Sequence, residues 1–341
     1  MTIVVALFLV VALAAYVLFG GADFGGGILE ALLPRGHLRR RLEATLAPVW
    51  EANHVWLIAV VVILFVGFPR FYAHGFTRLF VPINLALFAV LLRGVFFTLR
   101  KYDPAPSRAL TVAYSLLFRS SSIMAPICFG LIVGGLLTTH PGSPGSPPPD
   151  ASFAAVYLTP WLNGFGLLCG VFVAALFGYL ASVFFHGELT DPADRDIVWL
   201  RTRWLFGATF LLGGAVLGTG ALTDRVPLAM ALHPVQIACQ GVAAGGILGL
   251  WYARKAGARW GMRLAVGAQV IAILVGWFRA QAPVLLRTAG GPLTLDGAAA
   301  PPVTQFWLVV GLVVVLALVV PLLAWLYRVF DGARDGVEPS D

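Results

Sequence analysis

Charged residues are scarce in this sequence. Asp, Glu, Lys and Arg make up 11% of its 341 residues, whereas hydrophobic residues make up 59%. Ordinary soluble domains contain roughly a quarter charged residues, so the composition excludes that class and predicts an integral membrane protein. The net charge of +7 would suit a nucleic-acid-binding protein. We expect no nucleic-acid partner, however, because basic residues in a membrane protein mark the side of the bilayer on which a loop lies.

Cysteine is also rare. Cys128, Cys169 and Cys239 all lie inside apolar stretches. They are odd in number, and their spacing is unlike that of thiolate metal sites. We therefore expect three small buried side chains and no metal site in this chain. The sequence also lacks an internal repeat and any polar stretch long enough for a soluble domain.

Long apolar windows are abundant, and about 20 such residues cross a ~30 Å hydrocarbon core as a helix. The windows are continuously apolar, whereas strands of a membrane β-barrel alternate apolar and polar residues. We expect an all-α polytopic membrane helical bundle with about nine transmembrane helices, in a single domain over 1–330 with a polar tail at 331–341. The first span lacks the basic region of a signal peptide, so we expect it to be retained. The expected spans are 3–33, 49–69, 76–97, 111–137, 161–185, 201–222, 229–251, 261–280 and 304–330.

Basic residues gather in alternate connections between these spans, and the other connections are poor in them. The positive-inside rule therefore places the N-terminus outside and the C-terminus in the cytoplasm. The external connections include two irregular loops, 139–150 and 287–303, which are rich in Pro and Gly. The basic connections contain Arg35, Arg39, Arg40 and Arg41, then Arg100, Lys101 and Arg108, then Arg195, Arg201 and Arg203, then Arg254, Lys255, Arg259 and Arg263.

Several ionisable residues lie inside the first four spans, where each costs ~2.5–3.5 kcal/mol near the bilayer centre. Asp23 precedes Arg35 by about 18 Å of helix, which places it inside the membrane. Pro48 favours the first turn of the second span. Glu51 then lies about one turn into that span, and His54 follows on the same face.

Arginines accompany these acids. Arg93 and Arg100 are seven residues apart, about two helical turns, and so share one face of the third span. Arg119 lies in the fourth span and is followed by three serines. The first four spans therefore bring charges of both signs to the cytoplasmic half of the bilayer, where they can neutralise one another.

Two interpretations of these residues stay open. In the first, Glu51 stabilises a helix N-terminus, Asp23 and Arg93 form a structural ion pair, and His54 is a hydrogen-bonded core residue. In the second, Asp23, Glu51, Asn53 and His54 line a proton path that opens to the cytoplasm, because carboxylates and imidazole exchange protons through water.

The stretches "GADFGGGIL", "WEANHVWLI" and "FPRFYAHGF", followed by the two arginines seven residues apart, resemble subunit II of the cytochrome bd family of quinol oxidases. The order and spacing match across about the first 100 residues. The later stretch "LNGFGLLCG" is similar to the family pattern at the outer start of the fifth span. The C-terminal third resembles the family only in hydropathy. Matching positions are Asp23, Gly25, Gly27, Trp50, Asn53, Val55, Trp56, Leu57, Ile58 and 162–170.

The resemblance implies a heterodimeric core in which a homologous subunit I carries haems b and d, binds quinol and reduces oxygen to water. This chain would be the haem-free companion, inactive alone, which stabilises subunit I within the lipid bilayer. The family acid matched by Glu51 implies that this residue admits cytoplasmic protons. The resemblance also implies a multi-pass protein of a bacterial or archaeal cytoplasmic (inner) membrane. It leaves room for small accessory membrane subunits and for a structural quinone.

Some positions depart from the family pattern. Glu51 replaces the usual Asp, and His54 stands where Gln or Glu is common. Thr98 occupies a position that usually carries an acid between the two arginines, and Arg119 has no counterpart. Asp23 is therefore the expected counter-ion for Arg93. Arg100 and Arg119 are also expected as charge partners. Trp50 and Trp56 are expected as structural residues.

Three alternatives compete with this prediction. Haem in this chain would need two histidines at matching depth, but only His54 lies deep, and His233 lies near an outer span end. A secondary transporter would bind substrate at an intramembrane charged site, with "GGADFGGG" as a helix break, yet the charges do not divide into two equivalent halves. A purely structural subunit would leave all proton traffic to its partner.

Overall fold

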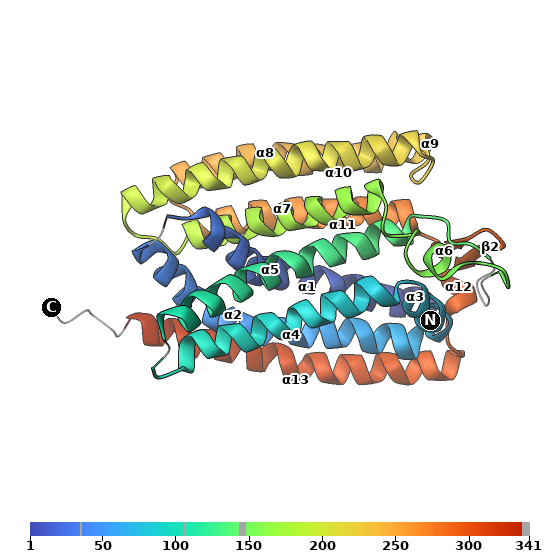
Figure 1. Ribbon diagram of the computed structural model, residues 1–341, viewed down its shortest axis with the longest axis horizontal. Coiled ribbons are helices and arrows are strands. Elements are labelled where there is room, and N and C mark those ends of the chain that lie inside the picture. Colours follow the sequence, from blue (N-terminus) through green and yellow to red (C-terminus); the bar gives the residue numbers. More distant parts are fainter. Residues whose placement is uncertain (35, 106, 143–147, 336–341) are drawn as a thin grey trace.

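A computed structural model describes residues 1–34, 36–105, 107–142 and 148–335, and it describes their side chains except those of 46–52, 231, 320 and 323–335. The long helices run side by side along one axis and form an elongated bundle (Figure 1). The helices are α1 (Thr2–Leu32), α2 (His37–Val62), the π-helical turn η1 (Ile63–Gly67), α3 (Pro69–Arg78), α4 (Phe80–Tyr102), α5 (Arg108–Leu136), α6 (Phe153–Tyr157), α7 (Gly164–His186), α8 (Pro192–Leu222), α9 (Leu228–Ala231), α10 (Pro234–Lys255), α11 (Arg259–Gln281), α12 (Leu295–Ala298) and α13 (Pro302–Asp335).

The prediction of an all-α polytopic membrane bundle is confirmed. Within the described part of the chain, eight helices are long and apolar enough to cross a membrane, and a ninth span exists if the bent pair formed by residues 53–67 and α3 is counted as one. The N-terminus and the end of α13 lie at opposite ends of the bundle (Figure 1). We call the end where α1 stops and α2 starts the basic end, and the opposite end the hairpin end.

The second span differs from the expectation. α2 begins at His37, so Pro48 lies inside the helix and not in its first turn. The chain then bends by 115° between residues 53–67 and α3. Pro69 occupies the start of α3, and Phe68 before it is non-helical (φ −132°, ψ 59°). The residue before a proline is disfavoured in the α conformation, which explains why the helix cannot run straight on.

The loop expected over 287–303 contains regular structure. Strands β1 (Val284–Thr288) and β2 (Gly291–Thr294) form an antiparallel hairpin, and Gly291, the first residue after the turn, takes a left-handed φ of +127°. The other external loop joins this hairpin, because the His140 N–H donates to the Arg287 carbonyl (2.8 Å). Short apolar segments on either side of an Ala-Gly-Gly stretch are the sequence signal for this hairpin.

Helices α1 and α7 lie at the centre of the bundle, and α1 contacts α2, α5, α7 and α13. The glycines of α1 allow this close packing. A side chain at Gly25 would collide with the Phe177 carbonyl of α7, and one at Gly27 would collide with Ser122 of α5. α1 is a continuous helix through this run, so the helix break that a transporter site would use is absent from it.

Candidate functional site

Two layers of ion pairs connect α1 to α4. Asp23 pairs with Arg93 and Glu30 pairs with Arg100. Seven residues separate the partners on each helix, which is about two turns or roughly 10 Å along the axis. The two helices therefore present acid to base twice along one shared face. We call Asp23 and Arg93 the deep pair, and the residues around Arg100 the shallow cluster.

The deep pair is fully enclosed. The Arg93 Nη2 group donates to Asp23 Oδ1 (2.5 Å) and to the Asp23 carbonyl (3.0 Å). The Asp23 and Arg93 side chains are 0% and 1% exposed. The guanidinium carbon lies 5.1 Å from the ring centre of Phe24 and 5.2 Å from that of Phe118. The charge of Arg93 is thus balanced by one carboxylate and two aromatic faces.

The shallow cluster lies closer to the basic end. Arg100 donates to Glu30 Oε2 and to Glu43 Oε2, at 2.9 Å in both cases. Arg119 lies 3.9 Å from the other Glu30 oxygen. The Arg100 guanidinium also lies over the Phe118 ring at 4.8 Å, so one aromatic side chain separates the two layers. Four helices, α1, α2, α4 and α5, supply this cluster.

Helix α2 adds polar groups beside the deep pair. Asn53 is fully buried and packs against Gly20, where an added side chain would lie 2.9 Å from its amide. Asn53 and His54 are close enough to Asp23 to act on its carboxylate. Trp56 stacks on Phe19 with ring centres 6.5 Å apart. The expected site residues Glu51 and Trp50 belong to α2, but their side chains lie outside the described residues.

An unusual number of buried polar atoms surrounds the deep pair. Seven of them have no hydrogen-bond partner among the described residues: Tyr16 Oη, Asp23 Oδ2, both amide atoms of Asn53, Trp56 Nε1, and Arg93 Nε and Nη1. Buried polar groups in proteins are nearly always bonded to protein or to water. This cluster of donors and acceptors is therefore suited to binding water molecules at intramembrane depth.

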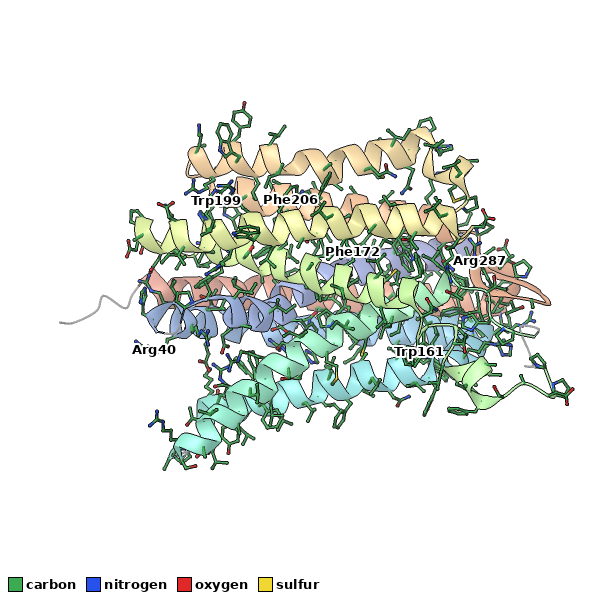
Figure 2. All side chains as sticks on the ribbon, turned by 45° about the horizontal axis from the view of Figure 1, so that its top comes forward. Arg40, Trp161, Phe172, Trp199, Phe206 and Arg287 are labelled. Atoms are coloured by element: carbon green, nitrogen blue, oxygen red, sulfur yellow. The ribbon has the colours of Figure 1, made fainter. Side chains whose placement is uncertain are left out.

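A cavity of about 440 Å³ opens at the basic end, next to the shallow cluster. Its lining includes Glu30, Glu43, Arg100 and Arg119, so the shallow cluster is reachable by water. Figure 2 shows the Arg40 side chain extending from the start of α2 toward α5 on this side. Together, the cavity, the shallow cluster and the deep pair form one polar series into the bundle.

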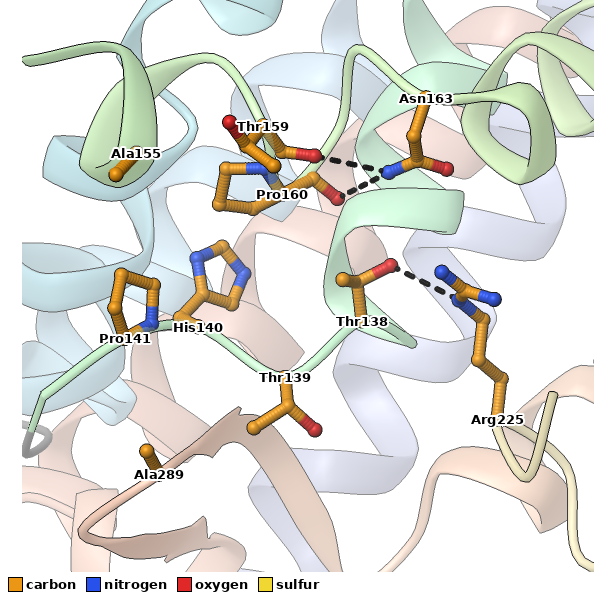
Figure 3. Close-up of a pocket in the computed structure, with 10 residues that line it drawn as sticks. All are labelled: Thr138, Thr139, His140, Pro141, Ala155, Thr159, Pro160, Asn163, Arg225 and Ala289. Atoms are coloured by element: carbon orange, nitrogen blue, oxygen red, sulfur yellow. Dashed lines mark hydrogen bonds between the residues drawn. The ribbon is translucent and has the colours of Figure 1, made fainter.

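A second cavity, of about 380 Å³, lies at the hairpin end (Figure 3). Arg225 lines it and contacts Thr138 Oγ1 (3.4 Å), and Asn163 donates to the Thr159 and Pro160 carbonyls (3.0 and 3.1 Å). Burial, together with nearby Arg78, lowers the pKa of His140 to about 4, although a hydrogen bond to the Gly135 carbonyl opposes the shift. No carboxylate lines this cavity among the described residues, so it does not continue the polar series.

The histidines lie at separate places in the bundle. His54 lies beside Asp23, whereas His233 caps α10 at the hairpin end, where its Nδ1 accepts from the Val235 N–H (3.3 Å). His37 at the basic end pairs with Asp194 (2.8 Å). Among the described residues, no group of three or more His, Cys, Asp or Glu side chains could hold a metal ion.

Three residues of the shallow cluster and its surroundings were not predicted from the sequence: Glu30, Glu43 and Phe118. A signal for Glu30 was present, because it follows Asp23 by seven residues, the same spacing as Arg93 and Arg100. Glu43 carries no such signal, since it lies in the expected connection before the second span. The structure places it on α2, which starts at His37.

The profile of the family described as cytochrome bd terminal oxidase subunit II matches residues 1–330. Cytochrome bd ubiquinol oxidase subunit 2 of Bacillus subtilis (strain 168) is 38% identical over 81 residues, which is 24% of this chain and 24% of that protein. Cytochrome bd-I ubiquinol oxidase subunit 2 of Escherichia coli (strain K12) is 31% identical over 167 residues, 47% of this chain and 42% of that protein.

The chain therefore matches less than half the length of these curated relatives. Among solved structures, the bd oxidase from Geobacillus thermodenitrificans superposes with a TM-score of 0.76 at 16% identity, over 96% of this chain and 98% of that chain. At this identity the likeness establishes the fold alone.

Proposed function

Because this chain belongs to the cytochrome bd terminal oxidase subunit II family, we propose that it is a subunit of a respiratory oxidase that oxidises quinol and reduces oxygen to water. In this proposal a partner subunit I carries the haems and the quinol site, and this chain is haem-free and inactive alone. The lack of a matched histidine pair, with His54 and His233 at different depths, supports placing the haems elsewhere. A structural quinone and accessory subunits stay predictions.

The finer proposal is that this chain admits protons from the cytoplasm. The observation that carries it is the polar series from the open cavity through the shallow cluster to the deep pair. The two arginines keep both layers charged and polar. Asp23 Oδ1 is held by Arg93, whereas Oδ2 has no hydrogen-bond partner within the described part of the chain. Oδ2 is therefore the atom at which Asp23 can take up and release a proton through water.

Glu51 enters this proposal from the sequence, through its match to the family acid. It shares α2 with Asn53 and His54, which lie beside Asp23. The proposal requires the basic end to face the cytoplasm, as the positive-inside rule predicts. A secondary transporter is not favoured, because α1 is unbroken.

The first experiment tests the complex. The tagged chain is purified in mild detergent, and the reduced-minus-oxidised visible spectrum is recorded on the eluate. We expect haem bands together with a second large membrane subunit, and we expect the bands to leave with that subunit when it is stripped away. A chain that retains haem alone would contradict the haem-free assignment, and a chain that brings neither subunit nor haem would contradict the oxidase assignment.

The second experiment tests proton entry with a matched pair of variants. Glu51→Gln removes the titratable proton, whereas Glu51→Asp restores the usual family acid. We expect Glu51→Gln to lower quinol-driven oxygen consumption by at least about a hundredfold at normal haem content, within the range typical of proton-transfer groups. Glu51→Asp should retain most of the activity. If both variants turned over at the rate of the unchanged protein, Glu51 would not admit protons, and this chain would keep only a structural role.

A further inference from the structure

The cavity at the basic end has a chemistry that the proton path does not need. Four arginines line it, namely Arg39, Arg40, Arg100 and Arg119, and two glutamates line it, namely Glu30 and Glu43. Four positive and two negative charges leave a formal charge of +2. Arg100 contacts both carboxylates at 2.9 Å, and Arg119 makes only a longer contact to Glu30, at 3.9 Å, so the cavity keeps an excess of positive charge.

Arg40 is the least constrained of these cations. It is exposed, it has no ion pair or hydrogen bond within the described part of the chain, and Figure 2 shows it extending from α2 on the side of α5. Arg119 lines the cavity from α5, where its Nε donates to the Ser115 carbonyl (3.0 Å), and its only described ion pair is a 3.9 Å contact to Glu30. Two guanidiniums from different helices can therefore approach a single anion.

The start of α2 adds a further attraction for an anion. Gly36 is the residue before the first turn of this 26-residue helix, and no side chain caps it. Gly36 also lines the cavity. The first N–H groups of a helix carry a partial positive charge and bind phosphate and carboxylate oxygens. Arginine suits the same ligand, because its planar donors match a phosphate group.

The surroundings indicate which molecule carries this anion. The cavity lies where α1 and α4 end and α2 and α5 begin, which is the depth of lipid headgroups in a membrane-spanning bundle. Val112 lines the cavity and is 60% exposed, and Leu116, one turn deeper on the same face of α5, is 57% exposed. These two side chains form an apolar strip that leads from the cavity into the hydrocarbon region.

We propose that the cavity at the basic end binds the phosphate group of an anionic phospholipid, whose acyl chain lies along the Val112–Leu116 strip. Arg40 and Arg119 contact the phosphate, and the first turn of α2 contributes N–H groups. The proposal does not rest on the proposed oxidase function, because the arginines, the cavity and the apolar strip are properties of this chain alone.

Native mass spectrometry tests the proposal on the purified protein together with the membrane subunits that copurify with it. The delipidated sample is titrated with phosphatidylglycerol, with zwitterionic phosphatidylcholine and with inorganic phosphate. The variants are Arg40→Gln and the double variant Arg40→Gln/Arg119→Gln. Arg203→Gln is the matched control, since Arg203 is an exposed arginine of α8 outside the cavity.

We expect phosphatidylglycerol to bind at least about tenfold more weakly to the double variant than to the unchanged protein, and several-fold more weakly to Arg40→Gln. Arg203→Gln should bind it normally, and phosphatidylcholine binding should not change in any variant. Equal phosphatidylglycerol binding by all four proteins would overturn the proposal. Inorganic phosphate that binds as tightly as the lipid, with the same dependence on Arg40, would also overturn it and identify a site for a soluble anion. Arg40→Gln keeps the test valid if the double variant fails to fold, because Arg40 supports no described contact.

Discussion

Removing one member of the deep pair should destabilise the protein strongly, because the other member cannot reach water. In Asp23→Ala, Arg93 would remain 1% exposed between two aromatic rings with no carboxylate. Breaking a buried ion pair in this way costs about 3–5 kcal/mol. An unfolding entropy of about 2.1 cal/mol/K per residue, taken over 341 residues, gives about 0.7 kcal/mol/K. The melting temperature should therefore fall by at least about 4 °C, and further if helices persist in the detergent-unfolded state.

Thermal unfolding of the detergent-purified complex, followed by loss of the monodisperse peak, measures this shift. Asp196→Asn is the matched control, since Asp196 pairs with Arg254 at 2.6 Å but is 74% exposed. That exposed pair should contribute at most about 1 kcal/mol. The double variant Asp23→Ala/Arg93→Met should recover part of the loss, because no buried charge is left. Equal shifts for Asp23→Ala and Asp196→Asn, or no recovery in the double variant, would refute the reasoning.

Three further predictions concern stability. His140 has a folded pKa of about 4, below its usual value of 6.5, so the unfolded state binds more protons than the folded state between these pH values. The free energy of unfolding should therefore fall by on the order of 3 kcal/mol as the pH drops from about 6.5 to 4. The melting temperature of His140→Gln should depend less on pH. Gly25→Val should prevent normal packing of α1 on α7, seen as aggregation in size-exclusion chromatography, whereas Gly214→Ala, with nothing within 4 Å, should not destabilise. Glu30→Gln should lower the melting temperature more than Glu43→Gln, because these side chains are 5% and 30% exposed; equal shifts would show that burial does not set the strength of the shallow cluster.

The sequence was informative about the deep pair because depth and charge can be read along each span. Its distance from Arg35 placed Asp23 inside the membrane. Asp23 was then the expected counter-ion of Arg93. The same approach could not place Glu43, since a helix start depends on capping and packing that hydropathy does not reveal. It also could not foresee the 115° bend at Phe68, although Pro69 marked a local restriction on the helix.

The sequence by itself determined the class of this protein and the family to which it belongs, because apolar length and short polar motifs are local properties of the chain. Only the tertiary structure decided which charges meet. Phe118 separates the two arginine layers, and Glu30 and Glu43 share Arg100, because glycines of α1 let α5 and α7 approach closely. The packing between helices decides which side of each helix faces its neighbour, and the sequence of a single span does not. The polar series and the cavity at its mouth are therefore properties of the folded bundle.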